Sequence, residues 1–436
     1  MVYRQRTKIL ISSSLLILIS LIGLTVSGNN AITASETNDP SLSDAVAIDA
    51  EKEARRYWKR QRELKAAVEA YFKKAVASGD IVGAGVSVVK GDSIVLAQGF
   101  GRKNIRTGEE VNDQTIFRLG SLSKGFAGVL AAHVKNEGKL DWGARVNEFI
   151  PEFQLGDEKN TDKITLAHLL SHSSGAPYHS YTNLVEAGLP LPDIAKRFKE
   201  VTPISDPGEI YSYQNALFAL SGEIIHRATG EEITEALENR FFKPLEMCST
   251  FMNHKSLLAA GNIATPHYRT RRGWRDRKIR NNYYNAVAAG GINASATDMG
   301  RWMRFLLGHN PEIMSRNAIE EAFTPFIEIK GHNKYYQRWP GHVSSYYGFG
   351  WRIHKFVEAD SDRLKTIWHH GGSVNNFRNE IALFPEADLG ICVLLNNTTG
   401  FAKKVIPDLY RIVQEIYGKT PAESGPENHL VAGFQP

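Results

Sequence analysis

The sequence predicts an α+β fold, an α/β sandwich with one antiparallel sheet built from both chain ends and flanked by terminal helices. Two observations predict this class. Short strand-type runs occur early, at 84–89 and 93–97, and return late, between 349 and 395. Helical patterns dominate from 121 to about 285. Because the sheet uses the two ends, an all-helical domain is expected to be inserted between its halves.

The spacing of apolar residues predicts the individual elements. From 50 to 78 apolar residues recur every three or four positions, which is typical of a helix. Lys90-Gly91-Asp92 joins the two early runs and predicts a hairpin. Later strands are expected at 349–354, 366–369, 379–384 and 389–395, followed by an amphipathic helix at 401–417.

The N-terminus has the layout of an export signal. Arg4, Arg6 and Lys8 precede an apolar run at 9–26, which predicts a cleaved signal peptide or an N-terminal membrane anchor over 1–34. We therefore expect export, to the periplasm or the extracellular space, with membrane contact only through this segment if it stays uncleaved. A linker is expected at 35–50, a folded domain at 51–420 (α/β part about 51–120 and 286–420, helical part about 121–285) and a tail at 421–436.

Composition excludes several classes of protein. The 436 residues are 42% hydrophobic and 23% charged, as in ordinary globular domains, and a net charge of +5 is too small to indicate nucleic-acid binding. Cys248 and Cys392 are too few for a disulfide framework or a cysteine-only zinc site, and the sequence leaves open whether they are bridged. The expected partner is a small-molecule or peptide substrate.

Ser121-Leu122-Ser123-Lys124 runs directly into an apolar helical stretch. Residues three apart share a helix face, and a helix N-terminus favours developing negative charge on Ser121. Lys124 can take the hydroxyl proton only if burial or a nearby cation lowers its pKa. The alternative is a helix-capping serine with a solvated lysine. A second copy of this spacing, Ser87 and Lys90, lies in a strand-type run, where the two side chains point to opposite faces.

Tyr213-Gln214-Asn215 follows a Pro-Gly turn and precedes a helix that Gly230 ends. The phenol is suited to passing a proton between a nucleophile and a leaving group, and the amide to orienting Lys124 and holding a substrate carbonyl. The alternative is a buried tyrosine bonded to backbone, with Asn215 capping the helix.

His369-His370-Gly371-Gly372 ends an apolar strand. Glycines there permit close backbone approach to a ligand, and a free N–H at Gly372 is suited to an oxyanion. Paired histidines also suggest a metal, but neighbours on a strand face opposite ways and no partner motif accompanies them, so no metal is expected. Residues 268–280 form a basic loop around Trp274, which indicates either an anionic partner, such as a cell-envelope polymer or lipid, or a solvated surface loop.

In order and spacing, these three motifs resemble the active-site elements of the serine β-lactamase and penicillin-binding-protein-like superfamily. The similarity is to the class C β-lactamase-related branch of esterases and D-amino-acid peptidases, and it covers about 60–418. The resemblance implies that Ser121 is the acylated nucleophile, Lys124 its base or proton relay and Tyr213 the general acid/base. It implies substrate binding by Asn215, His369 and Gly371, an oxyanion hole from the N–H groups of Ser121 and Gly372, and no cofactor.

One position departs from the family pattern. His369 stands where true β-lactamases carry lysine, and histidine is mostly neutral at pH 7. We therefore expect weak recognition of substrates that depend on a terminal carboxylate, β-lactams included, and favour other esters and amides. The alternatives are a D,D-carboxypeptidase or β-lactamase of the same fold, and an inactive envelope-binding protein on the same scaffold.

Overall fold

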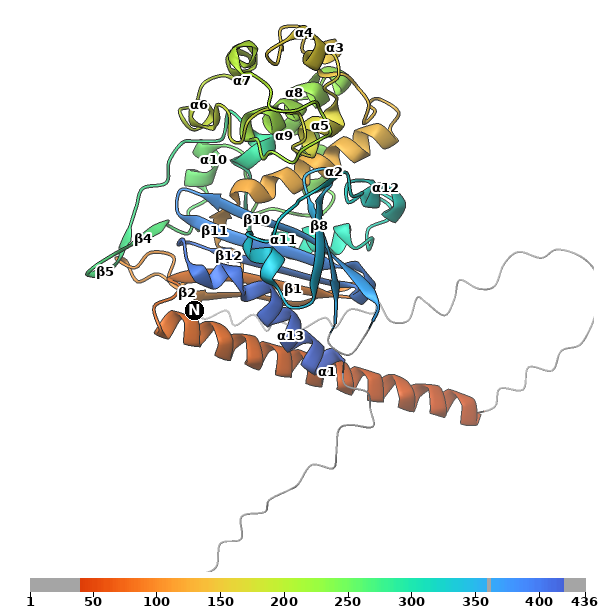
Figure 1. The fold of residues 1–436 in the computed structure, drawn as a ribbon. Helices are drawn as coiled ribbons and strands as arrows, with labels where there is room; N and C mark the ends of the chain where they lie inside the picture. The colour runs from red at the N-terminus through yellow and green to blue at the C-terminus, as the bar shows by residue number, and fades with distance from the viewer. Residues whose placement is uncertain (1–39, 359–361, 419–436) are drawn as a thin grey trace, which may run out of the picture. The chain divides into compact units, whose positions relative to one another are not determined.

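The computed structural model describes residues 40–358 and 362–418 (Figure 1). The chain divides into two units, 1–56 and 57–436, and helix α1 (Pro40–Ala77) begins in the first. This start lies inside the segment 35–50 that the sequence predicts to be a linker. The predicted leader and the tail at 421–436 lie outside the described residues. Within those residues, every helix is too short or too polar to cross a bilayer.

The second unit is organised around an antiparallel sheet of eight strands, in the order β2-β1-β12-β11-β10-β9-β8-β7. The strands are β1 (Gly83–Lys90), β2 (Ser93–Gly101), β7 (Ile327–Glu328), β8 (His342–Tyr347), β9 (Arg352–Val357), β10 (Leu364–Val374), β11 (Phe377–Phe384) and β12 (Leu389–Leu395). The two chain ends meet where β1 pairs with β12, Val86 lying opposite Val393. The predicted fold class is thereby confirmed.

The late strands differ in part from the sequence expectation. Residues 349–351 are not extended, because Gly350 has a φ of +84° and lies against the Lys124 carbonyl. Strand β8 was missed because His342–Tyr347 mixes histidine, serine and tyrosine and carries no clear apolar alternation. Strand β10 runs beyond His369 to Val374 and so carries the His-His-Gly-Gly segment within the sheet.

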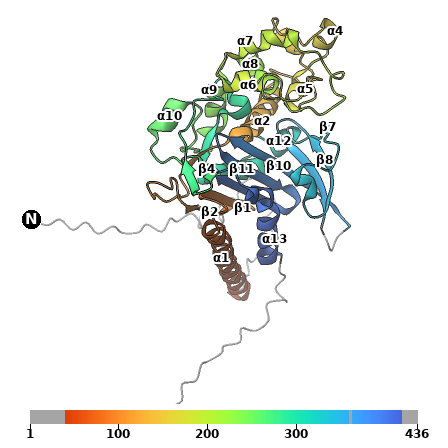
Figure 2. The same ribbon diagram turned by 60° about the vertical axis from the view of Figure 1, so that its left-hand side comes forward.

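Side chains alternate between the two faces of the sheet and build two cores. On one face, Ile391 and Val393 pack with α1 residues such as Phe72 and with α13 (Val405–Tyr417), which lies along the sheet in Figures 1 and 2. On the other, Cys392 and Leu394 pack in the core that includes α11 (Ala296–Leu306). Burying an apolar side chain of this size contributes about 2 kcal/mol to stability. Cys392 is buried, Cys248 is exposed, and both are free thiols.

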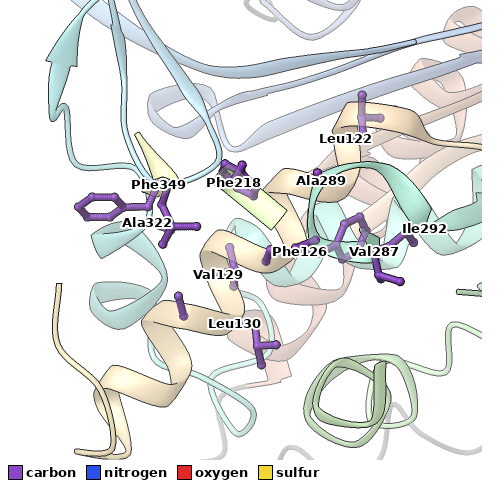
Figure 3. Close-up of a cluster of buried hydrophobic side chains, with 14 of the residues drawn as sticks. Leu122, Phe126, Val129, Leu130, Phe218, Val287, Ala289, Ile292, Ala322 and Phe349 are labelled. Atoms are coloured by element: carbon purple, nitrogen blue, oxygen red, sulfur yellow. The ribbon is translucent and has the colours of Figure 1, made fainter. Parts of the chain in front are cut away.

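Helices fill most of the middle of the chain, with α2 (Ser123–Asn136) at their centre. Figure 3 shows Phe126, Val129 and Leu130 of α2 among apolar neighbours that include Phe218 and Val287. The other helices are α3 (Val146–Phe149), α4 (Glu158–Thr161), α5 (Leu166–Leu170), α6 (Thr182–Glu186), α7 (Leu191–Arg197), α8 (Asn215–Thr229), α9 (Ile233–Leu237), α10 (His254–Ala259) and α12 (Arg316–Glu321).

The middle of the chain is not all helical, which corrects the sequence expectation. Within 121–285, β4 (His267–Thr270) pairs with β5 (Gly273–Asp276) and turns the predicted basic loop into a hairpin. Strands β3 (Ile116–Arg118) and β6 (Asn293–Ser295), which pair with each other, lie just outside this range, in the predicted α/β part. Two cations of the β4–β5 hairpin pack on its own aromatic rings, with Arg269 5.3 Å from the Trp274 ring and Arg277 4.7 Å from the Tyr268 ring.

Candidate active site

Ser121 lies in a single 3₁₀ turn, Gly120–Leu122, that leads into helix α2. Gly120 has a φ of +57°, and a Cβ there would come within 2.9 Å of the Ser373 backbone. This close approach brings the nucleophile candidate against the end of β10. Ser121 is half-buried and so remains within reach of a substrate.

Lys124, the second residue of α2, is fully buried. Its Nζ donates to Asn215 Oδ1 and to the Ala289 carbonyl, each at 2.8 Å. Burial, helped by the positive charge of Arg352, holds the pKa of Lys124 well below its ordinary value. No ion pair with a carboxylate stabilises its charged form among the residues described. The amine is therefore suited to accepting a proton, and it is not the solvated lysine of the alternative interpretation.

The Tyr213 hydroxyl lies 2.9 Å from Ser121 Oγ. The Tyr213 ring lies 4.9 Å from Lys124 Nζ, so the three predicted groups meet in one place. Burial raises the pKa of Tyr213 to about 12, although the positive charge of Arg352 and the hydrogen bond with Ser121 oppose the rise. The phenol is thus protonated at neutral pH and able to donate.

Asn215 is the first residue of α8 and is buried beside these groups. Its Oδ1 accepts from Lys124, and its Nδ2 lies 3.4 Å from both the Tyr283 hydroxyl and Thr182 Oγ1. The side chain therefore orients Lys124, as the sequence predicted. The N-cap position of α8 is occupied by Gln214, not by Asn215.

The structure does not bring His369 to this group of residues. His369 is fully buried on the other face of β10, where its Nε2 lies 2.7 Å from Glu380 Oε2 and its Nδ1 lies 3.0 Å from His354 Nε2. His370 faces the Ser121 side instead, with its Nε2 2.7 Å from the Tyr347 hydroxyl. The His-Gly pair on this face is thus His370 and Gly372. His369 packs instead against Tyr336 and Trp339, which line a cavity together with Tyr213, and its role in substrate binding stays a prediction.

Gly371 and Gly372 likewise lie against opposite faces of β10. A Cβ at Gly372 would lie 2.1 Å from the Leu119 carbonyl, whereas one at Gly371 would lie 2.7 Å from the Tyr335 hydroxyl on the other face. Asn379, which pairs with Gly372 in β11, donates to the Leu119 carbonyl at 3.0 Å. Gly372 thus lets β10 approach the turn that carries Ser121. Gly371 instead leaves room for the Tyr335 hydroxyl on the opposite face of the strand.

The end of β10 leaves one edge unpaired. Strand β9 pairs with β10 only as far as the Arg352–His369 pair, and from His370 to Val374 the edge away from β11 meets no other strand in the described part of the chain. This edge runs past Gly120. Its backbone N–H groups are suited to holding an oxyanion together with the N–H of Ser121.

Sequence reasoning missed His172, which supports Tyr213. His172 has a φ of +60°, is buried, and lies with its ring 4.1 Å from the Tyr213 ring. Its Nδ1 accepts from the Gln214 backbone at 3.1 Å, and burial holds its pKa well below the ordinary value. A neutral imidazole therefore packs under the phenol. No local spacing in the sequence singled it out.

A cavity of about 1400 Å³ adjoins Tyr213. Its aromatic lining includes Tyr178, Tyr211, Trp339, Phe356 and Tyr410. Arg352 also lines it and was likewise missed from the sequence. Within the described residues, no group of three or more His, Cys, Asp or Glu side chains is arranged to hold a metal.

Comparisons with known proteins place this geometry in a family. A model of the beta-lactamase family matches residues 68–414. The chain is 26% identical over 329 residues to the unguisins hydrolase ungD' of Aspergillus campestris, covering 73% of this chain and 59% of the relative. It is 24% identical over 340 residues to Protein flp of Staphylococcus aureus, covering 76% and 63%. It therefore spans about three fifths of these relatives' lengths.

A solved structure shares the fold. The octameric penicillin-binding protein homologue from Pyrococcus abyssi matches with a TM-score of 0.68 and 23% identity, covering 82% of this chain and 78% of that one. At this level of identity the likeness concerns the fold alone. The family match, which covers most of the chain, shows that this protein belongs to the beta-lactamase family of the serine β-lactamase and penicillin-binding-protein superfamily.

Proposed function

We propose that this chain is a serine hydrolase that cleaves an ester or amide bond through an ester intermediate on Ser121. The observation that carries the proposal is the 2.9 Å contact between Ser121 Oγ and the Tyr213 hydroxyl, beside a buried lysine whose pKa is lowered. Family membership supports the same reaction class. A nucleophile, a proton acceptor and a donor for an oxyanion are the parts that acyl transfer requires.

The first half of the reaction forms the acyl-enzyme. Ser121 Oγ attacks the carbonyl carbon, and its proton moves through the Tyr213 hydroxyl towards the neutral Lys124 amine. The carbonyl oxygen becomes an oxyanion held by the N–H of Ser121 and an N–H of the Gly372–Ser373 stretch. When the intermediate collapses, the bond to the leaving group breaks and the leaving group takes a proton from Tyr213. Water then cleaves the Ser121 ester by the same steps in reverse order.

The setting of the reaction is part of the proposal. The apolar run at 9–26, preceded by Arg4, Arg6 and Lys8, supports export beyond the cytoplasm. Outside the cytoplasm, the proposed substrate is a small molecule or a peptide, and the cell envelope is one source of such molecules. One relative is named as a hydrolase of unguisins, which is consistent with a hydrolytic reaction but identifies no substrate for this chain.

Covalent labelling tests the nucleophile. A fluorophosphonate probe should add one adduct to the wild type, read by intact mass, and Ser121→Ala should abolish it. Ser87→Ala is the matched control, because Ser87 belongs to the second Ser-x-x-Lys copy and is buried in β1. It should label as the wild type does. An adduct that persists in Ser121→Ala would contradict the assignment.

A substrate panel tests the reaction class. Esters and D-aminoacyl anilides should turn over, while a chromogenic cephalosporin should turn over slowly. A long-lived adduct with fluorescent penicillin, or rapid cephalosporin hydrolysis, would assign a D,D-carboxypeptidase or a β-lactamase instead. A folded wild type that hydrolyses nothing in the panel and takes no fluorophosphonate would indicate an inactive envelope-binding protein.

A further inference from the structure

The β4–β5 hairpin concentrates the positive charge of the chain. Residues 268–280 contain six arginines and one lysine but a single acidic residue, Asp276. All seven basic residues are exposed. The formal charge of this segment exceeds the +5 of the whole chain, so the remaining residues are together almost neutral. A basic surface patch of this kind attracts anionic partners.

One face of the hairpin is attached to the rest of the second unit. Arg269 and Trp274 lie opposite each other in the ladder, and Arg269 Nη1 and Trp274 Nε1 donate to the Gly79 carbonyl at 2.8 and 3.1 Å. Asp276 lies two residues after Trp274 in β5 and therefore points to the same face. It accepts from Arg106 Nε at 3.3 Å. The one acidic side chain of the hairpin is thus used on the attached face.

The opposite face carries cations without counter-charges. Tyr268 and Arg275 lie opposite each other on this face, and the Arg277 guanidinium lies 4.7 Å from the Tyr268 ring. Arg271 and Arg272 form the turn between the two strands. The outer basic face consists of Arg271, Arg272, Arg275, Arg277, Lys278 and Arg280. Within residues 40–358 and 362–418, no carboxylate forms an ion pair with any of these six side chains.

The outer basic face is too extended to be neutralised by one small anion. Strand β5 alone spans about 10 Å, at about 3.3 Å per residue, and the cations continue on both sides of it. None of them lines the cavity beside Tyr213. Figure 1 shows β4 and β5 at the edge of the second unit. The ligand that fits this face therefore presents several negative groups to an outer surface of the protein.

Two aromatic rings favour a bilayer over a soluble polyanion as this ligand. Tyr268 and Trp274 are half-buried among the arginines. Such rings are enriched where a membrane meets water, because they are apolar with a polar tip. Clusters of about four to eight Lys and Arg residues bind membranes with anionic headgroups. The apolar run at 9–26, which predicts a signal peptide or an anchor, supports a membrane as the surroundings of the chain.

We propose that the outer basic face of the β4–β5 hairpin binds the surface of an anionic phospholipid bilayer. The contact is electrostatic, between the six cations and lipid phosphates, and it goes beyond the proposed function because it needs no turnover. It adds a second membrane contact to the N-terminal segment, which the sequence predicted to be the only one. Salt should weaken it, since ions screen the charges of exposed side chains.

Vesicle binding tests this proposal with the full chain. Vesicles of phosphatidylcholine alone are compared with vesicles of equal parts phosphatidylcholine and phosphatidylglycerol, and bound protein is measured by flotation. The test variant is Arg271→Gln/Arg272→Gln/Arg275→Gln. These three side chains form no hydrogen bond, ion pair or ring contact in the described part of the chain, so their replacement should leave the fold intact.

The control variant removes the same amount of charge elsewhere. Lys199→Gln/Lys255→Gln/Lys330→Gln replaces three lysines that are exposed and lie outside the hairpin. Both variants keep the N-terminal segment, so its contribution to binding is the same in each. A difference between the two variants therefore reports the position of the lost charges and not their number.

The hairpin variant should be the one that loses affinity. Its affinity for vesicles with phosphatidylglycerol should fall about 10- to 100-fold, because each cation near an anionic surface contributes about a fivefold factor. The control variant should stay within about threefold of the wild type. With phosphatidylcholine alone, all three proteins should bind equally, and high salt should remove the difference on the anionic vesicles.

Several outcomes reject the inference. Equal affinity of the wild type for both kinds of vesicle does so, as do equal losses in the two variants. Binding to heparin, a soluble polyanion, without binding to the anionic vesicles would assign the face to an anionic polymer instead. If the triple variant does not fold, Arg271→Gln/Arg272→Gln takes its place and should lose about 5- to 25-fold, and no loss rejects the proposal. Absence of fluorophosphonate labelling contradicts only the proposed function.

Discussion

The two faces of strand β10 carry the same residue types and use them differently. On one face, His370 and Gly372 border Ser121, Tyr347 and the unpaired strand edge. On the other, His369 and Gly371 adjoin a buried polar network around Glu380, and Tyr335 of this network also lines the cavity beside Tyr213. The residue types alone therefore do not determine what a histidine or a glycine contacts in this segment. The face of the strand does.

On the His369 face, the buried polar side chains form a continuous chain of hydrogen bonds. Ser345 Oγ lies 2.8 Å from His354 Nδ1, His354 Nε2 lies 3.0 Å from His369 Nδ1, and His369 Nε2 lies 2.7 Å from Glu380 Oε2. Tyr335 donates to Glu380 at 2.8 Å. Each member has a partner, and satisfied buried networks of this kind specify one packing of the strands. This face is therefore expected to affect stability more than turnover.

The largest expected effect is on the site face, at Lys124. Lys124→Met should lower kcat/KM about 1000-fold, because the proton acceptor is lost. In the wild type, kcat/KM should fall as the pH drops through the lowered pKa of Lys124, since a protonated amine cannot accept a proton. The variant's residual activity should lack this acid limb. Lys90→Met, from the second Ser-x-x-Lys copy, is the control and should match the wild type at every pH.

The two glycines compare the faces directly. Gly372→Ala should lower kcat/KM about 100-fold, because its Cβ displaces the Leu119 backbone two residues before Ser121. Gly371→Ala meets the ends of the Tyr335, Arg378 and Glu380 side chains and no backbone. It should keep kcat/KM within about threefold while lowering stability by about 1 kcal/mol. Initial-rate kinetics measures kcat/KM of both variants, and denaturant unfolding measures their stability. Equal activity losses would mean that the two faces are not functionally distinct.

Removal of the network's carboxylate should affect stability instead of activity. Glu380→Ala leaves Arg378, His369 and Tyr335 without their shared partner and should destabilise the fold by about 3 kcal/mol. The kcat/KM of the folded fraction should stay within about threefold of wild type. Urea unfolding followed by fluorescence, together with initial rates at low temperature, checks both values. A large kinetic defect with normal stability would place the network in the reaction.

The smallest expected effect is a difference in pH dependence. Burial raises the pKa of Glu380 to about 7, above its unfolded value of 4.5, although Arg378 opposes the rise. The folded state therefore holds the proton more tightly. The stability this contributes is fully present below about pH 4.5 and is lost as the pH rises through about 7. The stability of the wild type relative to Glu380→Gln should fall across this window, and a constant or rising difference would contradict it.

Local patterns were enough to predict most of the fold and the central residues of the site. Short β-type runs located β1, β2 and β12, and the helical spacing located α13, because each depends on neighbours in sequence. Helix starts, turns and stops drew attention to Ser121, Lys124, Tyr213 and Asn215, and the resemblance of the three motifs together to a family's active site assigned their roles. Each of these signals comes from residues within a few positions of one another.

The face to which each side chain of β10 points was decided only by the folded chain. A shift of one residue moves every side chain of a strand to the other face, and the register depends on pairing with β9 and β11. Nothing within His369–Gly372 distinguishes the two possibilities. Long-range packing decides between them, because it determines which charges and hydrogen-bonding groups meet.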